Sequence, residues 1–253
     1  MDFTYFADSR IGGRETNEDC WLFYPLPFLH TISVFVVADG MGGLSHGAAC
    51  ARRTAAAFCS ELLYALYPDA LRDPDIVFSA EQLEQAARTA ALAAAERVYQ
   101  ESCDQFSSSG STLTAAVLGQ DALAVVSLGD SPAYLVQDSQ TILLNPLHNL
   151  AFEQRLHPGM PGYEEAACCL TQCVGTRPAS CLDPEVCSRP LASLRGSLLL
   201  LGSDGAFGTL PAGRIRILAN ALRATPSEII PVLFAAARES GSTDNQTLIA
   251  ICL

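Results

Sequence analysis

The sequence predicts a soluble α+β fold with mainly antiparallel sheet, and three observations lead to this prediction. Of the 253 residues, 49% are hydrophobic and 17% are charged, which is the balance of a packed domain and not of a disordered chain. Apolar, β-branched runs are separated by short turns, and strands joined in this way are normally antiparallel. Long Ala-rich stretches have the composition of helices. Because no stretch resembles a linker, we expect a single domain over residues 1–253.

The first expected strand is the continuous apolar run ISVFVVA at residues 32–38. β-Branched residues in a run of this length indicate a buried strand. The turn residues Asp39 and Gly40 end it, so a carboxylate is expected at the end of this strand.

Two helices are expected to follow. The first is the Ala-rich segment from about 47 to 66, which Pro68 is expected to close. The second should begin near Ser79, which has capping-box spacing to Gln82, and continue to about Glu101.

The middle of the chain predicts a β-meander. A strand at 111–118 is followed by turn residues and a second strand at 122–130, which is the pattern of a hairpin. Shorter strands are expected at 133–136 and 141–145, again joined by a short turn. Antiparallel neighbours are the consequence.

Residues from about 146 to 189 lack periodicity and contain several Pro, Gly and Cys residues, so we expect a loop-rich flap there. A buried strand should then end at Asp204, and a last strand should start just after Asp244. The flap includes a cysteine-rich segment at 168–187 that lacks paired CxxC spacing. Its thiols are therefore expected to be reduced and buried, and not to bind zinc.

Four aspartates share one sequence setting. Asp39, Asp130 and Asp204 follow apolar strands and Asp244 precedes one, each beside a turn residue. A single aspartate in this position is commonly only a turn former. Four of them in matching settings suggest that they converge at one edge of the sheets.

Convergent carboxylates are unstable alone, because like charges a few ångströms apart raise each other's pKa. Hard divalent cations such as Mg²⁺ or Mn²⁺ resolve the conflict, since they prefer oxygen ligands. Two such ions that share a bridging hydroxide perform hydrolytic phosphate chemistry. The formal net charge of −12 also suits cations, and it disfavours nucleic acid or an anionic membrane as partner.

Seven short motifs stand in a fixed order along the chain: RETNED (14–19), VVADGMGG (36–43), GSTLT (110–114), LGDSPAYL (128–135), LTQCVG (170–175), LLGSDGAF (200–207) and STDNQT (242–247). This ordered set resembles the motifs of the metal-dependent protein phosphatases of the protein phosphatase 2C family, in their bacterial form. The resemblance covers nearly the whole chain. It implies a four-layer αββα sandwich, in which two mainly antiparallel β-sheets are flanked by helices.

The resemblance also implies a metal site holding two Mn²⁺ or Mg²⁺ ions, with room for a third. Asp39 is similar to the carboxylate that bridges both metals and the Gly40 carbonyl to a ligand of one, while Asp204 and Asp244 are similar to ligands of the other. Three further residues belong to the implied metal site. Glu18 and Asp19 would hold metal-bound waters, and Asp130 would bind the third ion.

Two further residues are expected to assist. Arg14 resembles the phosphate clamp, for which a bidentate guanidinium has the right geometry. Asn245 is expected to support the site through hydrogen bonds, although Asn after Asp is also ordinary turn chemistry.

The chain departs from the family pattern at three places. Met41 stands where many relatives have a histidine that serves as general acid, so metal-bound water is expected to protonate the leaving group. Pro132 replaces an arginine, and LNPLH at 144–148 replaces the usual LTxDH. These departures leave open two alternatives: a phosphatase-like binding or sensory module without turnover, and a hydrolase of small phosphate esters.

The function expected from all of this is a serine/threonine protein phosphatase that uses a metal-bridging water or hydroxide. Its partners would be a phosphorylated protein substrate and a cognate serine/threonine kinase. The first residues lack the pattern of a signal peptide, and no apolar stretch is long enough to span a bilayer. A cytoplasmic location is therefore expected.

Overall fold

The computed structural model describes residues 3–253 apart from 27–28, 30, 43–45, 105–108 and 158. Within this part of the chain, antiparallel pairing builds two five-stranded sheets and one small ribbon. The first sheet has the order β1 (Thr4–Arg10), β12 (Gln246–Cys252), β11 (Leu198–Gly202), β8 (Ala133–Val136), β9 (Thr141–Leu143). The second has the order β10 (Glu185–Pro190), β7 (Ala122–Leu128), β6 (Leu113–Leu118), β3 (Ser33–Ala38), β2 (Cys20–Pro25). The ribbon pairs β4 (Gly40–Met41) with β5 (Gly110–Ser111).

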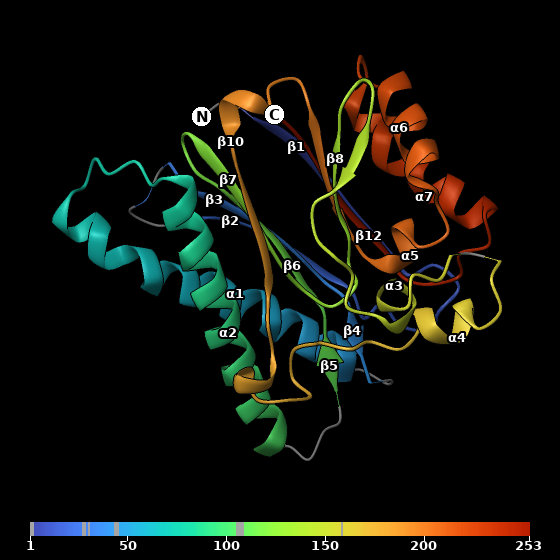
Figure 1. The fold of residues 1–253 in the computed structure, drawn as a ribbon, viewed down its shortest axis with the longest axis horizontal. Coiled ribbons are helices and arrows are strands. Elements are labelled where there is room, and N and C mark those ends of the chain that lie inside the picture. The colour runs from blue at the N-terminus through green and yellow to red at the C-terminus, as the bar shows by residue number, and fades with distance from the viewer. Residues whose placement is uncertain (1–2, 27–28, 30, 43–45, 105–108, 158) are drawn as a thin grey trace.

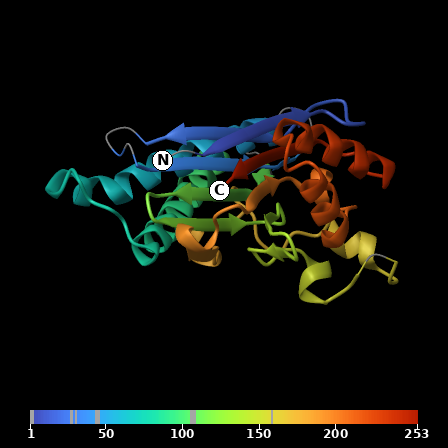
Figure 2. The same cartoon turned by 90° about the horizontal axis from the view of Figure 1, so that it is seen from above.

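Helices cover the outer faces of both sheets. The second sheet carries the long helices α1 (His46–Arg72) and α2 (Ala80–Asp104), and the first carries α5 (Asp204–Phe207), α6 (Ala212–Ala221) and α7 (Ile229–Glu239). Figures 1 and 2 show these two groups of helices at opposite sides of the molecule. The smaller helices are α3 (Leu150–Glu153), α4 (Tyr163–Ala167) and three 3₁₀ turns, η1 (Ala179–Cys181), η2 (Leu191–Ser193) and η3 (Pro226–Glu228). The predicted αββα sandwich is confirmed.

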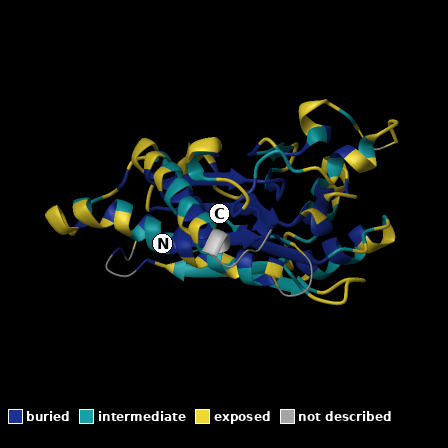
Figure 3. Ribbon diagram, turned by 90° about the horizontal axis from the view of Figure 1, so that it is seen from below, coloured by how far each residue is buried: buried dark blue, intermediate teal, exposed yellow. Residues whose placement is uncertain are grey.

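The central strands are apolar on both faces because each face meets another layer. In β3, Val34 and Val36 pack toward α1 and α2, while Phe35 and Val37 pack between the sheets with residues such as Leu199. Figure 3 shows the sheets buried and the exposed residues on the outer helices and loops. The continuous apolar run predicted a strand for this physical reason.

The first helix is longer than the sequence predicted. Pro68 does not end α1, which continues to Arg72. A proline inside a helix removes a backbone hydrogen bond, but Leu62, Leu66 and Ala70 are buried on the same helix, and their packing holds it together. The start of α2 agrees with the capping box: Ser79 N–H donates to Gln82 Oε1 (2.9 Å), and Gln82 N–H donates to Ser79 Oγ (3.2 Å).

The segment from 146 to 189 is mostly loop, with the short helices α3 and α4, but it is not irregular to its end. Its last residues form β10, which pairs with β7 from Glu185 to Pro190. The strands β1 and β2 were not predicted. Both are half-buried along nearly their whole length, so their sequences show no clean alternation. Among the helices that the structure describes, none is long and apolar enough to cross a bilayer.

Candidate metal centre

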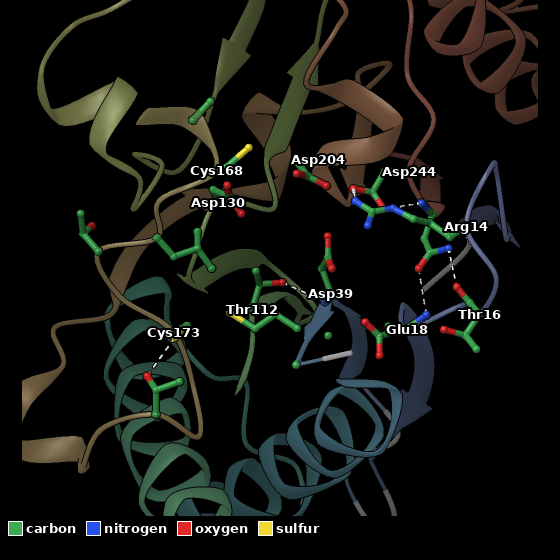
Figure 4. A pocket seen from close by; sticks show the side chains of 18 of the residues that line it. Arg14, Thr16, Glu18, Asp39, Thr112, Asp130, Cys168, Cys173, Asp204 and Asp244 are labelled. Carbon is green, nitrogen blue, oxygen red and sulfur yellow. Dashed lines mark hydrogen bonds and ion pairs between the residues drawn. The ribbon is translucent and has the colours of Figure 1, made fainter. Parts of the chain in front are cut away.

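A cavity of about 790 Å³ opens at one end of the sheets, and most of the predicted site residues line it. Figure 4 shows Asp39, Asp130, Asp204 and Asp244 around this opening. The predicted residues that line the cavity are Arg14, Glu18, Asp39, Gly40, Asp130, Asp204, Asp244 and Asn245. Asp19 is not part of the lining. It lies behind the cavity, where Ser203 Oγ donates a hydrogen bond of 2.8 Å to its Oδ2.

Asp39 is placed by the end of β3 and by Thr112, which follows β5. The backbone N–H of Asp39 donates to Thr112 Oγ1 (2.9 Å), and the N–H of Thr112 donates to the Asp39 carbonyl (2.8 Å). Gly40 follows in a place where any Cβ would collide with the carbonyl oxygens of Gly47 and Glu18. Only glycine allows this close approach of the chain to itself.

Asp204 and Asp244 come from neighbouring strands of the first sheet. Asp204 is the first residue of α5, directly after β11, and Asp244 lies in the turn before β12. Arg14 Nη2 forms an ion pair of 2.6 Å with Asp244 Oδ2. The guanidinium therefore lies at the edge of the cluster of carboxylates, as Figure 4 shows.

Asn245 connects the two ends of the chain at this site. Its Nδ2 donates to the carbonyls of Ile11 (2.8 Å) and Thr16 (2.9 Å), and its Oδ1 accepts from the N–H of Glu18 (2.9 Å). These bonds use both N–H donors and the carbonyl oxygen of the side chain to hold the loop that carries Arg14 and Glu18.

The turn that carries Asp130 is held by the segment 145–149. Asn149 Nδ2 donates to Asp130 Oδ2 (3.2 Å), and His148 Nδ1 accepts from the N–H of Gly129 (3.1 Å). Asn145 accepts from the N–H of Ala133 (2.7 Å) and donates to the Ser131 carbonyl (3.1 Å). This role was not predicted from the sequence, in which LNPLH was only a departure from the family pattern. The available signal was the number of Asn and His hydrogen-bonding groups beside an expected turn.

The carboxylates make one another difficult to ionise. Burial raises the pKa of Asp39 well above its usual range, and the charges of Asp19 and Asp204 raise it further. Burial, followed by the charge of Asp244, raises the pKa of Asp204. Both side chains reach the water of the cavity, but the protein walls around them still make a negative charge costly.

The pKa values of Asp130 and Asp19 are raised as well. Burial raises the pKa of Asp130 to about 7, with a further contribution from Asp204 and an opposing one from the Asn149 hydrogen bond. Burial raises the pKa of Asp19 to about 6, although hydrogen bonds from Thr247 and Ser203 lower it. A nearby cation would remove this cost.

The residues present fit hard divalent cations. Glu18 Oε1 and Asp19 Oδ1 are buried and have no hydrogen-bond partner among the described residues. The donor set is almost entirely oxygen, which is the ligand type that Mg²⁺ and Mn²⁺ prefer. Among the residues the structure describes, no three His, Cys, Asp or Glu side chains form a ready-made metal cage. The carboxylates come from several parts of the cavity wall, and the side chains of Asp39 and Asp204 lie within hydrogen-bond reach of each other.

Met41 lines the cavity beside Gly40, where it can neither donate nor accept a proton. Cys168 and Cys173 line it from the flap segment. Of the cysteine-rich segment, Cys173 is buried but Cys168, Cys169 and Cys181 are exposed, so the expectation of generally buried thiols was wrong there.

The family model described as "Protein phosphatase 2C" matches residues 8–156 of this chain. The serine/threonine phosphatase stp of Listeria monocytogenes is 28% identical over 225 residues, which are 86% of this chain and 83% of the relative.

Solved structures share the fold. The serine/threonine phosphatase Stp1 of Staphylococcus aureus superposes with a TM-score of 0.82 at 20% identity, covering 100% of this chain and 96% of the other. The catalytic domain of the serine threonine protein phosphatase PstP, solved in complex with two manganese ions, superposes with a TM-score of 0.72 at 23% identity, covering 99% and 97%.

Proposed function

This chain belongs to the protein phosphatase 2C family, and from that premise we propose that it is a metal-dependent hydrolase that removes phosphate from phosphoserine and phosphothreonine in proteins. The observation that carries the proposal is the gathering of Asp39, Asp130, Asp204 and Asp244 around one open cavity with Arg14 at its edge. So many acidic groups in one cavity have a chemical reason if they hold cations.

The proposed cofactors are two Mn²⁺ or Mg²⁺ ions, with Asp130 available for a third. Asp39 would contact both ions, the Gly40 carbonyl would contact one, and Asp204 and Asp244 would contact the other. The unpartnered oxygens of Glu18 and Asp19 would accept hydrogen bonds from waters on the ions. When bound, such ions supply Lewis acidity, which polarises a phosphate ester and makes water a nucleophile at neutral pH.

The protein's own groups orient the substrate. Arg14, whose side chain is 59% exposed, can turn its guanidinium from Asp244 toward two oxygens of a phosphoryl group. Thr112 and Asn245 keep Asp39 and the Arg14 loop in place, which limits the reorganisation needed during reaction. Since Met41 has no proton to give, the leaving oxygen would be protonated from water.

The proposed partners are a phosphorylated protein and a cognate serine/threonine kinase, and the proposed location is the cytoplasm. The phosphorylated protein follows from the family, and the kinase is a more specific proposal. The cysteines that the structure describes are free thiols, which agrees with a reducing compartment.

The alternative of a binding module without turnover rested on Pro132 and the LNPLH segment. Asn145 and His148 of that segment, together with the neighbouring Asn149, hold the Asp130 turn. An active enzyme is therefore the better supported function.

The test is hydrolysis of p-nitrophenyl phosphate and of a phosphothreonine peptide by the purified chain with Mn²⁺, with Mg²⁺ and with EDTA. We expect turnover of both substrates with metal and none in EDTA, together with loss of turnover in Asp39→Asn. Full activity in EDTA, or inactivation in proportion to thiol alkylation, would contradict the metal-dependent mechanism. Turnover of the ester alone would indicate a small-ester hydrolase.

A further inference from the structure

One wall of the cavity is made by the segment from Leu170 to Arg177, and its lining side chains are not carboxylates. They are Leu170, Thr171, Cys173, Thr176 and Arg177. Figure 4 shows Cys173 on the side of the cavity away from Arg14. The cavity therefore has a second positively charged residue, Arg177, at a wall separate from the Arg14 edge.

This wall is attached to the element that positions Asp39. Val174 and Ser111 exchange two backbone hydrogen bonds of 2.9 Å, and Ser111 directly precedes Thr112. The N–H of Thr171 donates to the His148 carbonyl (2.9 Å), which joins the wall to the segment that holds Asp130. Cys173 Sγ and Thr176 Oγ1 lie 3.0 Å apart and close the turn before Arg177. Arg177 is thus presented from a backbone that is fixed relative to the carboxylates.

The charge of Arg177 is available to a ligand. Within the described structure, its hydrogen bond is a long one of 3.5 Å from Nη1 to the Thr171 carbonyl, and none of the described ion pairs includes it. Arg14, by contrast, lies 2.6 Å from Asp244. The Arg177 charge does reach the wall, because it lowers the pKa of the Cys173 thiol against the larger effect of burial.

The wall contains a second polar group, the hydroxyl of Thr171. Thr171 Oγ1 is buried and has no hydrogen bond to any described residue. A buried hydroxyl without a partner is costly, and a ligand or water that accepts or donates there would remove the cost. Arg177 Nη1 lies 3.5 Å from the Thr171 carbonyl, so the guanidinium and this hydroxyl belong to the same part of the wall. An exposed guanidinium is a suitable receptor for a carboxylate or a phosphate.

We infer that Arg177, with the hydroxyl of Thr171, forms an anion subsite that selects phosphoserine or phosphothreonine segments carrying a second acidic group near the scissile phosphate. This inference rests on the proposed phosphatase function. The protein has a net charge of −12, so acidic peptides are repelled at long range. A local cation at the cavity wall would reverse that preference for peptides whose acidic group reaches it.

The experiment compares kcat/KM for three phosphoserine peptides of one sequence, with flanking Gln residues, flanking Glu residues, or one flanking phosphoserine. The variants are Arg177→Ala, Arg177→Glu and the control Arg195→Glu. Arg195 is also exposed, and Arg195→Glu changes the net charge by the same amount as Arg177→Glu. Arg195 lies before β11, at the strand end opposite Asp204. p-Nitrophenyl phosphate, which has no flanking groups, reports whether each variant keeps its catalytic machinery.

Wild type should prefer an acidic peptide to the Gln peptide by about threefold, as expected for one exposed charge pair. The ratio of kcat/KM for the acidic peptide to kcat/KM for the Gln peptide should be near one in Arg177→Ala and below one in Arg177→Glu. Arg195→Glu should keep the wild-type ratio. All variants should hydrolyse p-nitrophenyl phosphate at the wild-type rate. Whichever acidic peptide is preferred identifies the anion as a carboxylate or a second phosphate.

An unchanged ratio in Arg177→Ala or Arg177→Glu, with normal turnover of the small ester, would overturn the subsite and leave the proposed function intact. An equal change in Arg195→Glu would show that net charge, and not the subsite, sets the preference. A wild-type protein that turns over none of the substrates would overturn the proposed function and the subsite together.

Discussion

Single residues at this centre are held by partners that are distant in sequence. Asn245 holds Glu18 across 227 positions, and Thr112 holds Asp39 across 73. The sequence could identify the aspartates, because each lies beside a strand and within a recognisable motif. It could not identify Thr112, Asn145 or Asn149 as their supports, because hydrogen bonds between distant segments follow from the fold and not from local pattern.

Asn149 has two roles, and two substitutions can separate them. Its Nδ2 donates to Asp130, and its Oδ1 caps α3 by accepting from the N–H of Phe152 (2.9 Å). Asn149→Ser keeps a cap but loses the bond to Asp130, whereas Asn149→Ala loses both. We expect turnover to fall several-fold in both variants, and the free energy of unfolding to fall by about 1 kcal/mol more in Asn149→Ala.

The turnover of Asn149→Ser and Asn149→Ala should approach that of wild type as pH rises. The Asn149 hydrogen bond favours the ionised form of Asp130, so its loss leaves more of that carboxyl protonated near neutral pH, and a higher pH restores the charge. The measurements are pH profiles of turnover and denaturant unfolding for both variants. Full turnover of Asn149→Ser near pH 7 would show that the bond to Asp130 does not matter.

At the scale of the elements, the sequence predicted best where a strand is buried on both faces. The run at 32–38 and the hairpin at 111–130 correspond to β3, β6 and β7. Prediction failed where tertiary contacts decide the outcome. Pro68 lies inside α1 because buried leucines hold the helix, and β10 forms at the end of an apparently irregular segment because β7 offers an open edge.

On the scale of the whole molecule, the fold gathers negative charge at one end of the sheets. The antiparallel pairing of β1 with β12 places the residues after β1 beside the residues before β12, so that Arg14 meets Asp244 across 230 positions. β1 was not predicted, and for that reason the approach of these two loops rested on the family resemblance alone.

The acidic cavity predicts an unusual dependence of stability on pH in the metal-free protein. The pKa values of Asp19 and Asp130 in the folded protein, about 6 and about 7, exceed the ordinary value of 3.8. The folded state therefore binds more protons than the unfolded state between pH 4 and 7, so these groups stabilise the protein at low pH and that contribution is lost as pH rises through 6 to 7.

Urea unfolding in EDTA at several pH values should show this loss, and it should be smaller in Asp130→Asn, which has no proton to release there. The difference between the two proteins isolates the group from other titrations. Parallel pH profiles for wild type and Asp130→Asn would contradict the raised pKa of Asp130.

If the carboxylates around Asp39 and Asp204 form a metal site for hydrolysis, wild type and Asp204→Asn must respond differently to Mn²⁺. Thermal melts of both proteins across a Mn²⁺ titration, with turnover measured in parallel, show whether they do. Without metal, the variant should melt no lower than wild type, because the amide keeps the shape of the side chain and removes a repelling charge. With Mn²⁺ at 100 times its dissociation constant, wild type should gain about 2.7 kcal/mol of stability by mass action for each ion that binds. The variant should gain much less and lose most of its turnover, because its neutral amide is a poorer ligand. Equal stabilisation of the two proteins by Mn²⁺, or an active Asp204→Asn, would contradict the account and place the metal site elsewhere.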